Sequence, residues 1–228
     1  MASATASKAR RRNSSQAGTG EVADWIRERI RRGRFVPGQR LIEADIIAQT
    51  GASRGKVREA LQRLEAEDLV TIEEYRGASV KKIGPEEIRQ IYHARMALEG
   101  LAAAEIAAAD APELKARLAE LQDKMNHWRD NGGRERFSEL NGEWHNLIIE
   151  GSGNAYVAQF VARLSVPTYR LLFARFYTEQ SVDEANADHQ KITAAILEGR
   201  SADAEAAMRQ HITDGLAAVS ELAAQLAD

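Results

Sequence analysis

Residues 37–70 read PGQRLIEADIIAQTGASRGKVREALQRLEAEDLV, and this stretch decides the fold of the N-terminal part. A short helix is predicted over residues 43–49, and Gly51 closes it. Its inward residues are expected to be Ile46, Ile47 and Ala48. Ser53 then suits the N-cap of another helix, because its side-chain oxygen accepts an orphan amide of the first turn. The buried stripe of that second helix is Val57, Ala60, Leu61 and Leu64.

The flanking segments complete a recognisable unit. A helix begins near Glu21 and ends by Gly33. Its apolar face is formed by Val22, Trp25, Ile26 and Ile30. Two β-branched stretches follow the central pair of helices, over residues 69–73 and 78–82, and they read as a hairpin. Helix, helix, turn, helix and hairpin together predict a winged helix-turn-helix over residues 20–83.

Three polar residues lie one turn apart on the outward side of the helix that follows Ser53. Arg54, Arg58 and Gln62 are spaced by four, and Lys56 flanks them. This face suits a DNA major groove, because arginine forks onto guanine, glutamine can address adenine, and lysine positions phosphate. The alternative is an ordinary solvated face, which the turn and hairpin on either side make the weaker interpretation.

The charges are divided between the two parts of the chain. Residues 1–83 carry 17 Lys and Arg against 11 Asp and Glu, whereas residues 84–228 carry 14 against 23. A basic segment joined to an acidic one is typical of a polyanion-binding module attached to a domain with another task. Residues 1–19 have too little apolar surface to fold and are expected to form a disordered basic tail, which either contacts phosphate or is a solvated leader.

Composition excludes several classes of protein. The 228 residues include no cysteine, which excludes disulfide scaffolds, thiolate zinc fingers, iron–sulfur clusters and cysteine nucleophiles. No run approaches the ~20 apolar residues of a membrane-spanning helix, and the first 20 residues lack the apolar core of a signal peptide. A cytoplasmic protein without membrane contact is therefore expected.

The remainder, residues 84–228, is predicted to be an all-α helical bundle, so that the whole chain is mainly α. Pro85 marks the start of its first helix, after a boundary at Gly84. Asp110 and Ser181 each have an acid three residues later, which is the spacing of a capping box. The helical patterns cover residues 85–108, 111–131, 134–150, 154–177, 182–199 and 201–227.

The histidines of this part follow a pattern of their own. His189 and His211 are 22 residues apart, but a turn at residues 199–201 lies midway between them, so an antiparallel helix pair would bring them level. Asn141 and His145 are four apart and share a helix face. Three imidazoles and one amide can therefore converge, either as buried polar residues with partners or as ligands. The other two histidines, His93 and His127, are expected at the surface.

Residues 22–83 resemble the DNA-binding domain of the GntR superfamily of bacterial transcription regulators. The resemblance is carried by the stretch quoted above and by YRGASV at residues 75–80. It implies that Arg54 and Arg58 contact the operator and that Arg76 and Gly77 form a wing tip reaching the minor groove. The departures from the family pattern are Gly55-Lys56 in place of Thr-Pro, Asp68 in place of glycine, Ala44 in place of an arginine found in some members, and the acidic Glu73-Glu74.

Residues 87–222 resemble the FCD ligand-sensing domain of the FadR subfamily. The recurring pieces are IYHARMALEGLAA, LNGEWHNLIIEGSGN and DHQKITAAILEGRSADAEAAMRQH. In metal-containing members this pattern implies a divalent cation, such as Zn²⁺, Ni²⁺ or Mn²⁺. The ligands carried over are Asn141, His145, His189 and His211. Asn141 replaces the commoner aspartate, and Trp144 replaces a phenylalanine.

The expected function is a homodimeric transcription regulator, in this family most often a repressor, that binds a palindromic double-stranded DNA operator. A small organic acid is the expected effector, its carboxylate filling open positions on the metal. Arg95, in the family's R-x-x-L-E position, and Arg170 are candidate second anchors, or else ordinary surface ion pairs. Two alternatives remain: the same regulator without metal, binding an apolar or acyl ligand, and a metal-dependent hydrolase.

Overall fold

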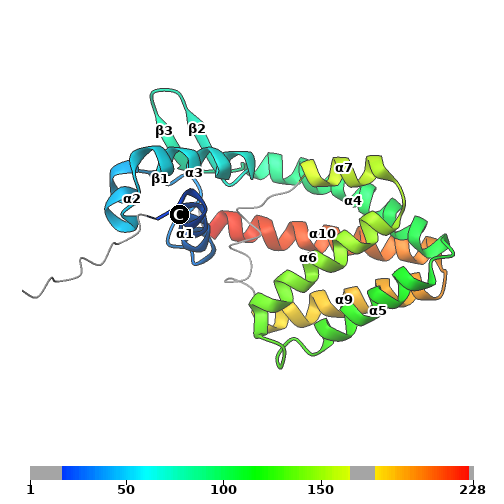
Figure 1. Cartoon of the computed structure of the whole chain (residues 1–228). Coiled ribbons are helices and arrows are strands. Elements are labelled where there is room, and N and C mark those ends of the chain that lie inside the picture. The colour runs from blue at the N-terminus through cyan, green and yellow to red at the C-terminus, as the bar shows by residue number, and fades with distance from the viewer. Residues whose placement is uncertain (1–16, 165–177, 226–228) are drawn as a thin grey trace, which may run out of the picture.

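The computed structural model describes residues 17–164 and 178–225, which form a small mixed part and a larger helical part (Figure 1). The small part contains α1 (Thr19–Arg31), β1 (Arg40–Leu41), α2 (Glu43–Thr50), α3 (Arg54–Ala66), β2 (Val70–Glu73) and β3 (Gly77–Val80). The helical part contains α4 (Pro85–Ala108), α5 (Pro112–Asn126), α6 (Gly133–Gly151), α7 (Ala155–Arg163), α9 (Glu179–Leu197) and α10 (Ser201–Gln225). α4 leads away from the small part, and α10 packs along α4 on its way back (Figure 1).

The predicted helix-turn-helix is present. α2 ends at Gly51, whose φ of +69° is the left-handed conformation that favours glycine. The Ser53 hydroxyl then accepts the Lys56 N–H at 3.4 Å and caps α3. α3 buries the four residues expected of it, Val57, Ala60, Leu61 and Leu64. The prediction for Ala48 is wrong, because Ala48 is exposed and only Ile46 of α2 is fully buried. Residues two positions apart on a helix differ by ~200° around its axis, so Ala48 faces away from Ile46.

The wing is a three-stranded antiparallel sheet in the order β1-β3-β2. β2 and β3 form the predicted hairpin, with Val70 opposite Val80 and Glu73 opposite Gly77. β1 adds a third strand, with Arg40 opposite Ser79. The sequence does not predict β1, because a two-residue strand is too short to show alternation.

Two non-glycine residues of the small part have a positive φ. Asp68, where the resemblance places a glycine, has a φ of +61° and forms an ion pair with Lys81. Aspartate tolerates the left-handed region better than most residues do, which explains how it replaces glycine here. Tyr75, in the hairpin turn, has a φ of +63°. The turn therefore uses Tyr75 as well as Gly77 for its left-handed geometry.

Each part has a hydrophobic core of its own. The core of the small part draws on residues from Val22 to Val80. The core of the helical part draws on residues from Ile83 to Val219. Ile83 directly precedes Gly84, which is the N-cap of α4. In the ranges 17–164 and 178–225, no helix has the length and apolarity needed to cross a membrane.

Within the described residues, each predicted bundle segment contains a helix, but both predicted capping boxes are wrong. α5 starts after Ala111, and no side chain caps it. Pro112 occupies the first turn, where its fixed φ suits a helix and its missing N–H costs nothing. α9 begins at Glu179, and the Thr178 hydroxyl accepts the Ser181 N–H at 3.1 Å. Threonine is also a favoured N-cap, and capping at Thr178 adds three residues to the helix before Val182.

Two predicted helices differ in length. The one predicted over residues 111–131 ends at Asn126. The chain instead turns before α6, where Gly132 and Gly133 have φ values of +99° and +73°. Of the helix predicted over residues 154–177, the structure describes α7, and residues 165–177 lie outside the described residues.

Candidate functional site

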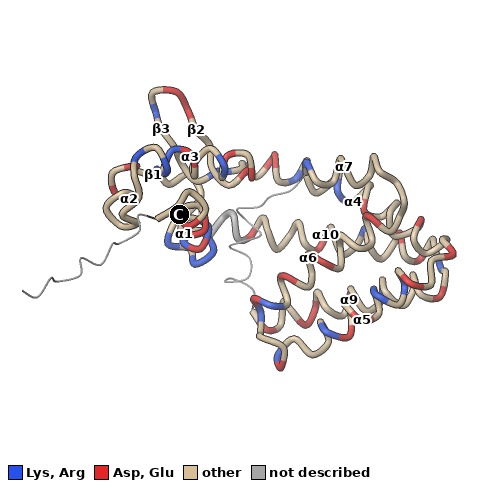
Figure 2. The backbone as a smooth tube through the Cα atoms, in the orientation of Figure 1, with Lys and Arg blue, Asp and Glu red and all other residues tan. Residues whose placement is uncertain are grey.

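The outward face of α3 carries the predicted row of polar side chains. Arg54 and Arg58 have 72% and 63% of their side-chain surface exposed, and Gln62 is exposed one turn further on. Lys56 is half-buried beside this row. Lysine and arginine mark α3 and the neighbouring elements of the small part in Figure 2. A face of this kind presents forked donors of the type that read base edges in a major groove.

Both arginines of this row are paired with one carboxylate from α2. The Arg58 Nε donates to Glu43 Oε1 at 2.9 Å. The Arg54 Nε lies 3.9 Å from the other carboxylate oxygen of Glu43. Glu43 is itself only partly exposed, because α2 packs against α3. Sequence analysis assigned no role to Glu43.

The wing tip carries charges of both signs, as the colours at the end of the β2–β3 hairpin show (Figure 2). Arg76 is 82% exposed, and its Nη1 donates to the Glu73 carboxylate at 3.0 Å. Gly77 has a φ of +81°, and Tyr75 beside it is 96% exposed. The predicted wing residues are therefore at an exposed, protruding tip.

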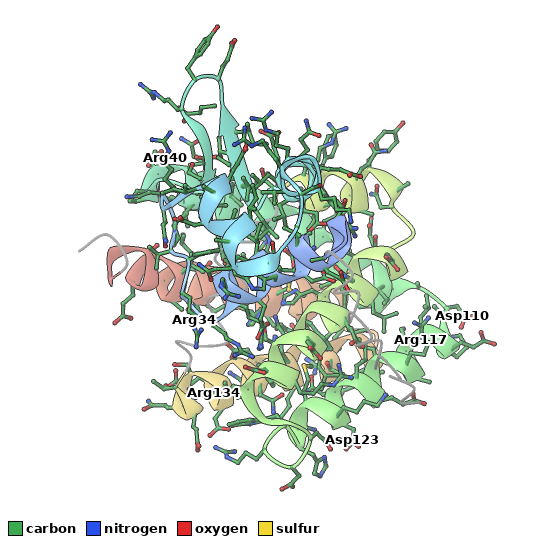
Figure 3. The ribbon with its side chains drawn as sticks, turned by 60° about the vertical axis from the view of Figure 1, so that its left-hand side comes forward. Arg34, Arg40, Asp110, Arg117, Asp123 and Arg134 are labelled. Atoms are coloured by element: carbon green, nitrogen blue, oxygen red, sulfur yellow. The ribbon has the colours of Figure 1, made fainter. Side chains whose placement is uncertain are left out.

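A further arginine belongs to this surface. β1 places Arg40 beside the base of the hairpin, as Figure 3 shows. A Cβ at Gly77 would lie 3.8 Å from the Arg40 Nη2 atom, so Arg40 reaches the wing glycine. Sequence analysis missed Arg40 because its position depends on the pairing of β1 with β3.

Three histidines from three helices converge in the helical part. α9 and α10 are antiparallel around the turn at Gly199, and the Nε2 atoms of His189 and His211 are 3.1 Å apart. The His145 Nε2 on α6 lies 3.4 Å from the His211 Nε2. The sequence prediction that these rings meet is confirmed in its geometry. His93 and His127 are exposed, as predicted.

A buried carboxylate orients one of these rings. Glu99 on α4 is fully buried, and its Oε2 lies 2.8 Å from the His145 Nδ1. The other carboxylate oxygen accepts the Arg95 Nε–H at 2.7 Å. An ionised carboxylate can only accept, so the His145 Nδ1 carries the proton and its Nε2 presents a lone pair to the cluster.

Burial lowers the pKa values of two of these histidines, His145 and His189. Burial lowers the pKa of His145 to about 4, and Glu99 only partly opposes this shift. Burial and the two neighbouring histidines lower the pKa of His189 well below its ordinary value. Burial alone would raise the pKa of Glu99, but Arg95 and His145 outweigh it and hold that pKa at about 2. At neutral pH the site therefore contains an ionised Glu99 and neutral imidazoles at His145 and His189.

Trp144 packs against the ring of His189. Trp144 is fully buried, and its ring centroid lies 4.6 Å from that of His189. Its Nε1–H donates to the Thr193 hydroxyl at 3.0 Å, and that hydroxyl donates to Gln122 at 3.1 Å. The hydrogen-bonded chain connects α6 to α9 and α5. His189 Nδ1, by contrast, is a buried atom without a hydrogen-bond partner in the described part of the chain.

The histidine cluster borders a cavity of about 380 Å³. Its polar wall includes Arg95, Ser138, Asn141, His145 and His211. The lining of the cavity also includes apolar residues, among them Ile149 of α6 and Val161 of α7. Asn141 and Arg95 thus border the same cavity as the cluster, as their predicted roles require. The other predicted anchor, Arg170, lies outside the described residues.

The donor set fits a divalent cation. Zinc–nitrogen bonds are about 2.0–2.1 Å, so two tetrahedral ligands lie roughly 3.3–3.4 Å apart. The Nε2 separations of 3.1 and 3.4 Å match that spacing. A neutral imidazole has one N–H, and that of His145 is used by Glu99, so hydrogen bonds alone cannot satisfy this group of nitrogens. A carboxylate on the far ring nitrogen is the usual support of a metal-binding histidine.

Glu99 is the site residue that sequence analysis missed. It is the glutamate of the R-x-x-L-E pattern, four residues after Arg95, and it directly precedes the largely apolar stretch GLAAAEIAA of residues 100–108. A carboxylate position followed by such a run is a signal of a buried, partnered acid. Only the packing of α4 against α6 shows that its partner is His145.

The fold and the family matches define a class of protein: a DNA-binding transcription regulator with a helical C-terminal FCD domain, not an enzyme. The chain belongs to the GntR family of bacterial regulatory proteins, whose model matches residues 19–80, and the FCD domain model matches residues 90–214. These matches confirm the resemblances stated from the sequence.

Individual relatives agree with this assignment. The chain is 27% identical over 199 residues to the HTH-type transcriptional repressor GlaR of Escherichia coli, covering 82% of this chain and 89% of the relative. It is 28% identical over 213 residues to the transcriptional regulator LutR of Bacillus subtilis, covering 81% and 93%. The solved structure of E. coli McbR superposes with a TM-score of 0.70 at 20% identity, over 90% of this chain and 97% of that one.

Proposed function

We propose that this regulator is a homodimeric repressor whose affinity for a palindromic operator is controlled by a small carboxylate metabolite. The metabolite would bind at a divalent metal held by Asn141, His145, His189 and His211. The observation that carries this proposal is the meeting of three Nε2 atoms, with separations of 3.1 and 3.4 Å, in a cluster of which His145 and His211 line a cavity. Repression is supported by the similarity to GlaR, which is a transcriptional repressor.

The residues of the cavity suit an acidic ligand. A divalent cation such as Zn²⁺, Ni²⁺ or Mn²⁺, when bound, would supply open coordination positions for a carboxylate. Arg95 borders the cavity, and its Nε–H donates to the Glu99 carboxylate, so its guanidinium lies beside the proposed ligand position. Asn141 is neutral, so the four proposed ligands bring no negative charge, and an anionic effector would balance the cation. Arg170 remains a proposed second anchor.

The sensor is connected to the reader through α6. This helix carries Asn141 and His145, and Glu135 in its first turn lies 2.6 Å from the Arg31 Nη1 at the end of α1. Effector binding that shifts α6 would therefore change how α1 and the attached helix-turn-helix are held. A dimer with altered spacing of its two readers would then fit an operator less well.

On the DNA, Arg54, Lys56, Arg58 and Gln62 are the proposed major-groove residues, and Arg76 with Gly77 is the proposed minor-groove tip. We retain the division into a reader over residues 20–83 and a sensor over residues 84–228, which agrees with the change of hydrophobic core near Ile83. We also propose a cytoplasmic location, because a DNA-binding regulator works beside the bacterial chromosome.

One alternative has an observation in its favour. The apolar residues of the cavity lining, among them Ile149 and Val161, could accept an acyl or other apolar ligand without a metal. Thermal-shift screening of small organic acids and of acyl compounds, with and without a chelator, separates the two ideas. Stabilisation by organic acids that disappears with chelator supports the metal site, whereas stabilisation by acyl compounds in chelator supports the alternative.

The metal itself is tested by elemental analysis of untagged protein. Wild type is expected to contain one divalent ion per chain, and H189A is expected to lose it. H93A and H127A are matched controls, because they remove an exposed histidine from the same domain. Wild-type protein without metal, even after incubation with Zn²⁺, Ni²⁺ and Mn²⁺, would remove the metal from the proposal and leave the regulator.

A further inference from the structure

Glu43 is an acid in the middle of a surface proposed to bind a polyanion. It is placed at the first position of α2, and its carboxylate faces the two arginines of α3. One oxygen is 2.9 Å from the Arg58 Nε, and the other is 3.9 Å from the Arg54 Nε. A single carboxylate thus binds one arginine directly and attracts the second.

The atoms used in this contact matter for base reading. Arginine reads guanine by donating two hydrogen bonds to O6 and N7. The contact with Glu43 takes the Nε–H of Arg58, so the terminal Nη1 and Nη2 groups remain for a partner beyond the carboxylate. Arg58 is 63% exposed, which leaves those groups accessible from solvent. The ion pair therefore orients the guanidinium without blocking its fork.

The charge of Glu43 matters for phosphate binding. Contacts with phosphate are independent of sequence, and their strength follows the number of positive charges brought to the backbone. Glu43 reduces the charge of the Glu43, Arg54 and Arg58 group from two to one. Its carboxylate would also repel a phosphate that approached either arginine.

We infer that Glu43 is a positioning residue for sequence discrimination, which holds Arg58 and Arg54 for base contacts and weakens their use as phosphate contacts. This inference rests on the proposed role of α3 in the major groove. Glu43 does not touch the bases in this account, and it acts through the two arginines. Its effect should therefore appear in the ratio of specific to non-specific affinity.

The test uses the full chain and two DNA probes of equal length. One probe is a duplex selected from random DNA by the wild-type protein, and the other is a duplex of scrambled sequence. E43Q is expected to bind scrambled DNA about threefold to tenfold more tightly, with a salt dependence steeper by about one phosphate contact. Its discrimination between the two probes should fall about tenfold, because Arg58 loses its orientation.

D45N is the matched control. Asp45 lies in the same first turn of α2, is exposed, and forms no ion pair within the described part of the chain. D45N removes the same charge from the same helix end, so it reproduces general electrostatic effects and effects on α2 stability. The inference requires that E43Q lose more discrimination than D45N does.

A double-mutant cycle distinguishes positioning from folding. If Glu43 acts through Arg58, E43Q should reduce discrimination little further in an R58A background. Equal discrimination by wild type and E43Q, or equal further loss in the R58A background, would overturn the inference. A wild-type protein that selects no sequence at all would instead overturn the proposed reading function beneath it.

Discussion

Replacing Glu99 by glutamine is expected to destabilise the protein by about 3 kcal/mol at pH 7. Glu99 has no exposed side-chain surface, and Arg95 has 16% exposed. Removing one partner of a buried ion pair costs about 3–5 kcal/mol, since the other charge is left without compensation. The low end applies because Arg95 borders the cavity.

The same substitution is expected to weaken metal binding by roughly 10- to 100-fold, which is the usual effect of removing a carboxylate that supports a metal-binding histidine. Glutamine can still accept a hydrogen bond from the His145 Nδ1, so the ring should stay in the site. The carboxylate charge, which raises the basicity of the other nitrogen, would be lost. The measurements are urea unfolding in chelator and competition with a zinc-binding dye.

The pH of this experiment follows from the pKa of Glu99. That pKa is held at about 2, below its ordinary value of 4.5. A group with a lowered folded-state pKa contributes its full stability above the unfolded value and loses it as the pH falls from about 4.5 to 2. At pH 7 the contribution is complete, so the loss in E99Q should be complete as well.

E205Q is the matched control for E99Q. Glu205 pairs with Arg209 at 3.0 Å, also four residues apart on one helix, but the two side chains are 39% and 42% exposed. An exposed pair of this kind contributes roughly 0.5 kcal/mol or less, and E205Q should leave metal affinity unchanged. If E99Q unfolds at the same urea concentration as E205Q and binds zinc as wild type does, the proposed role of the buried pair is wrong.

Three further predictions concern other parts of the molecule. Burial lowers the pKa of His145 from 6.5 to about 4. Below pH 6.5 the unfolded chain therefore binds a proton at this histidine that the folded, metal-free chain does not bind, and this group should reduce the free energy of unfolding by up to about 1.4 kcal/mol per pH unit as the pH falls toward 4. Urea midpoints at pH 7, 6 and 5 that do not change would contradict this. Y75G should stabilise the protein by about 1 kcal/mol, because the tyrosine has a φ of +63° and is almost fully exposed, whereas Y75A should give no such gain in thermal unfolding. E135Q should change the free energy of unfolding by less than about 1 kcal/mol, since Glu135 is 67% exposed. The same substitution should reduce the effect of effector on operator binding. An unchanged effect in a gel-shift titration would show that the ion pair with Arg31 does not connect the two parts.

The helix-turn-helix and the bundle could be predicted because periodicity and caps are local properties. Ser53 caps α3 as its position indicates, and α4 begins at Pro85. β1 could not be predicted, since two residues show no pattern and its pairing with β3 is a tertiary event. The two capping boxes failed because a spacing rule does not choose between neighbouring caps such as Thr178 and Ser181.

Some contacts of the candidate sites could be predicted from the sequence, and others could not. His189 and His211 could be paired from the sequence, because the position of one turn sets the register of two antiparallel helices. Glu99 and His145 are 46 residues apart on helices joined through other elements, so no local pattern connects them. Glu43 and Arg58 are separated by 15 residues and a turn, and only the angle between α2 and α3 brings them into contact.

The unbroken course of α6 gives it the mechanical character of a lever. Its pivot is the ligand cluster near His145, and its free arm ends at Glu135, ten residues or about 15 Å away. A tilt of about 5° at the pivot would displace the far end by about 1.3 Å, comparable with the helix shifts that switch other regulators. In the proposed mechanism, a small molecule that tilted α6 to this extent would separate Glu135 from Arg31.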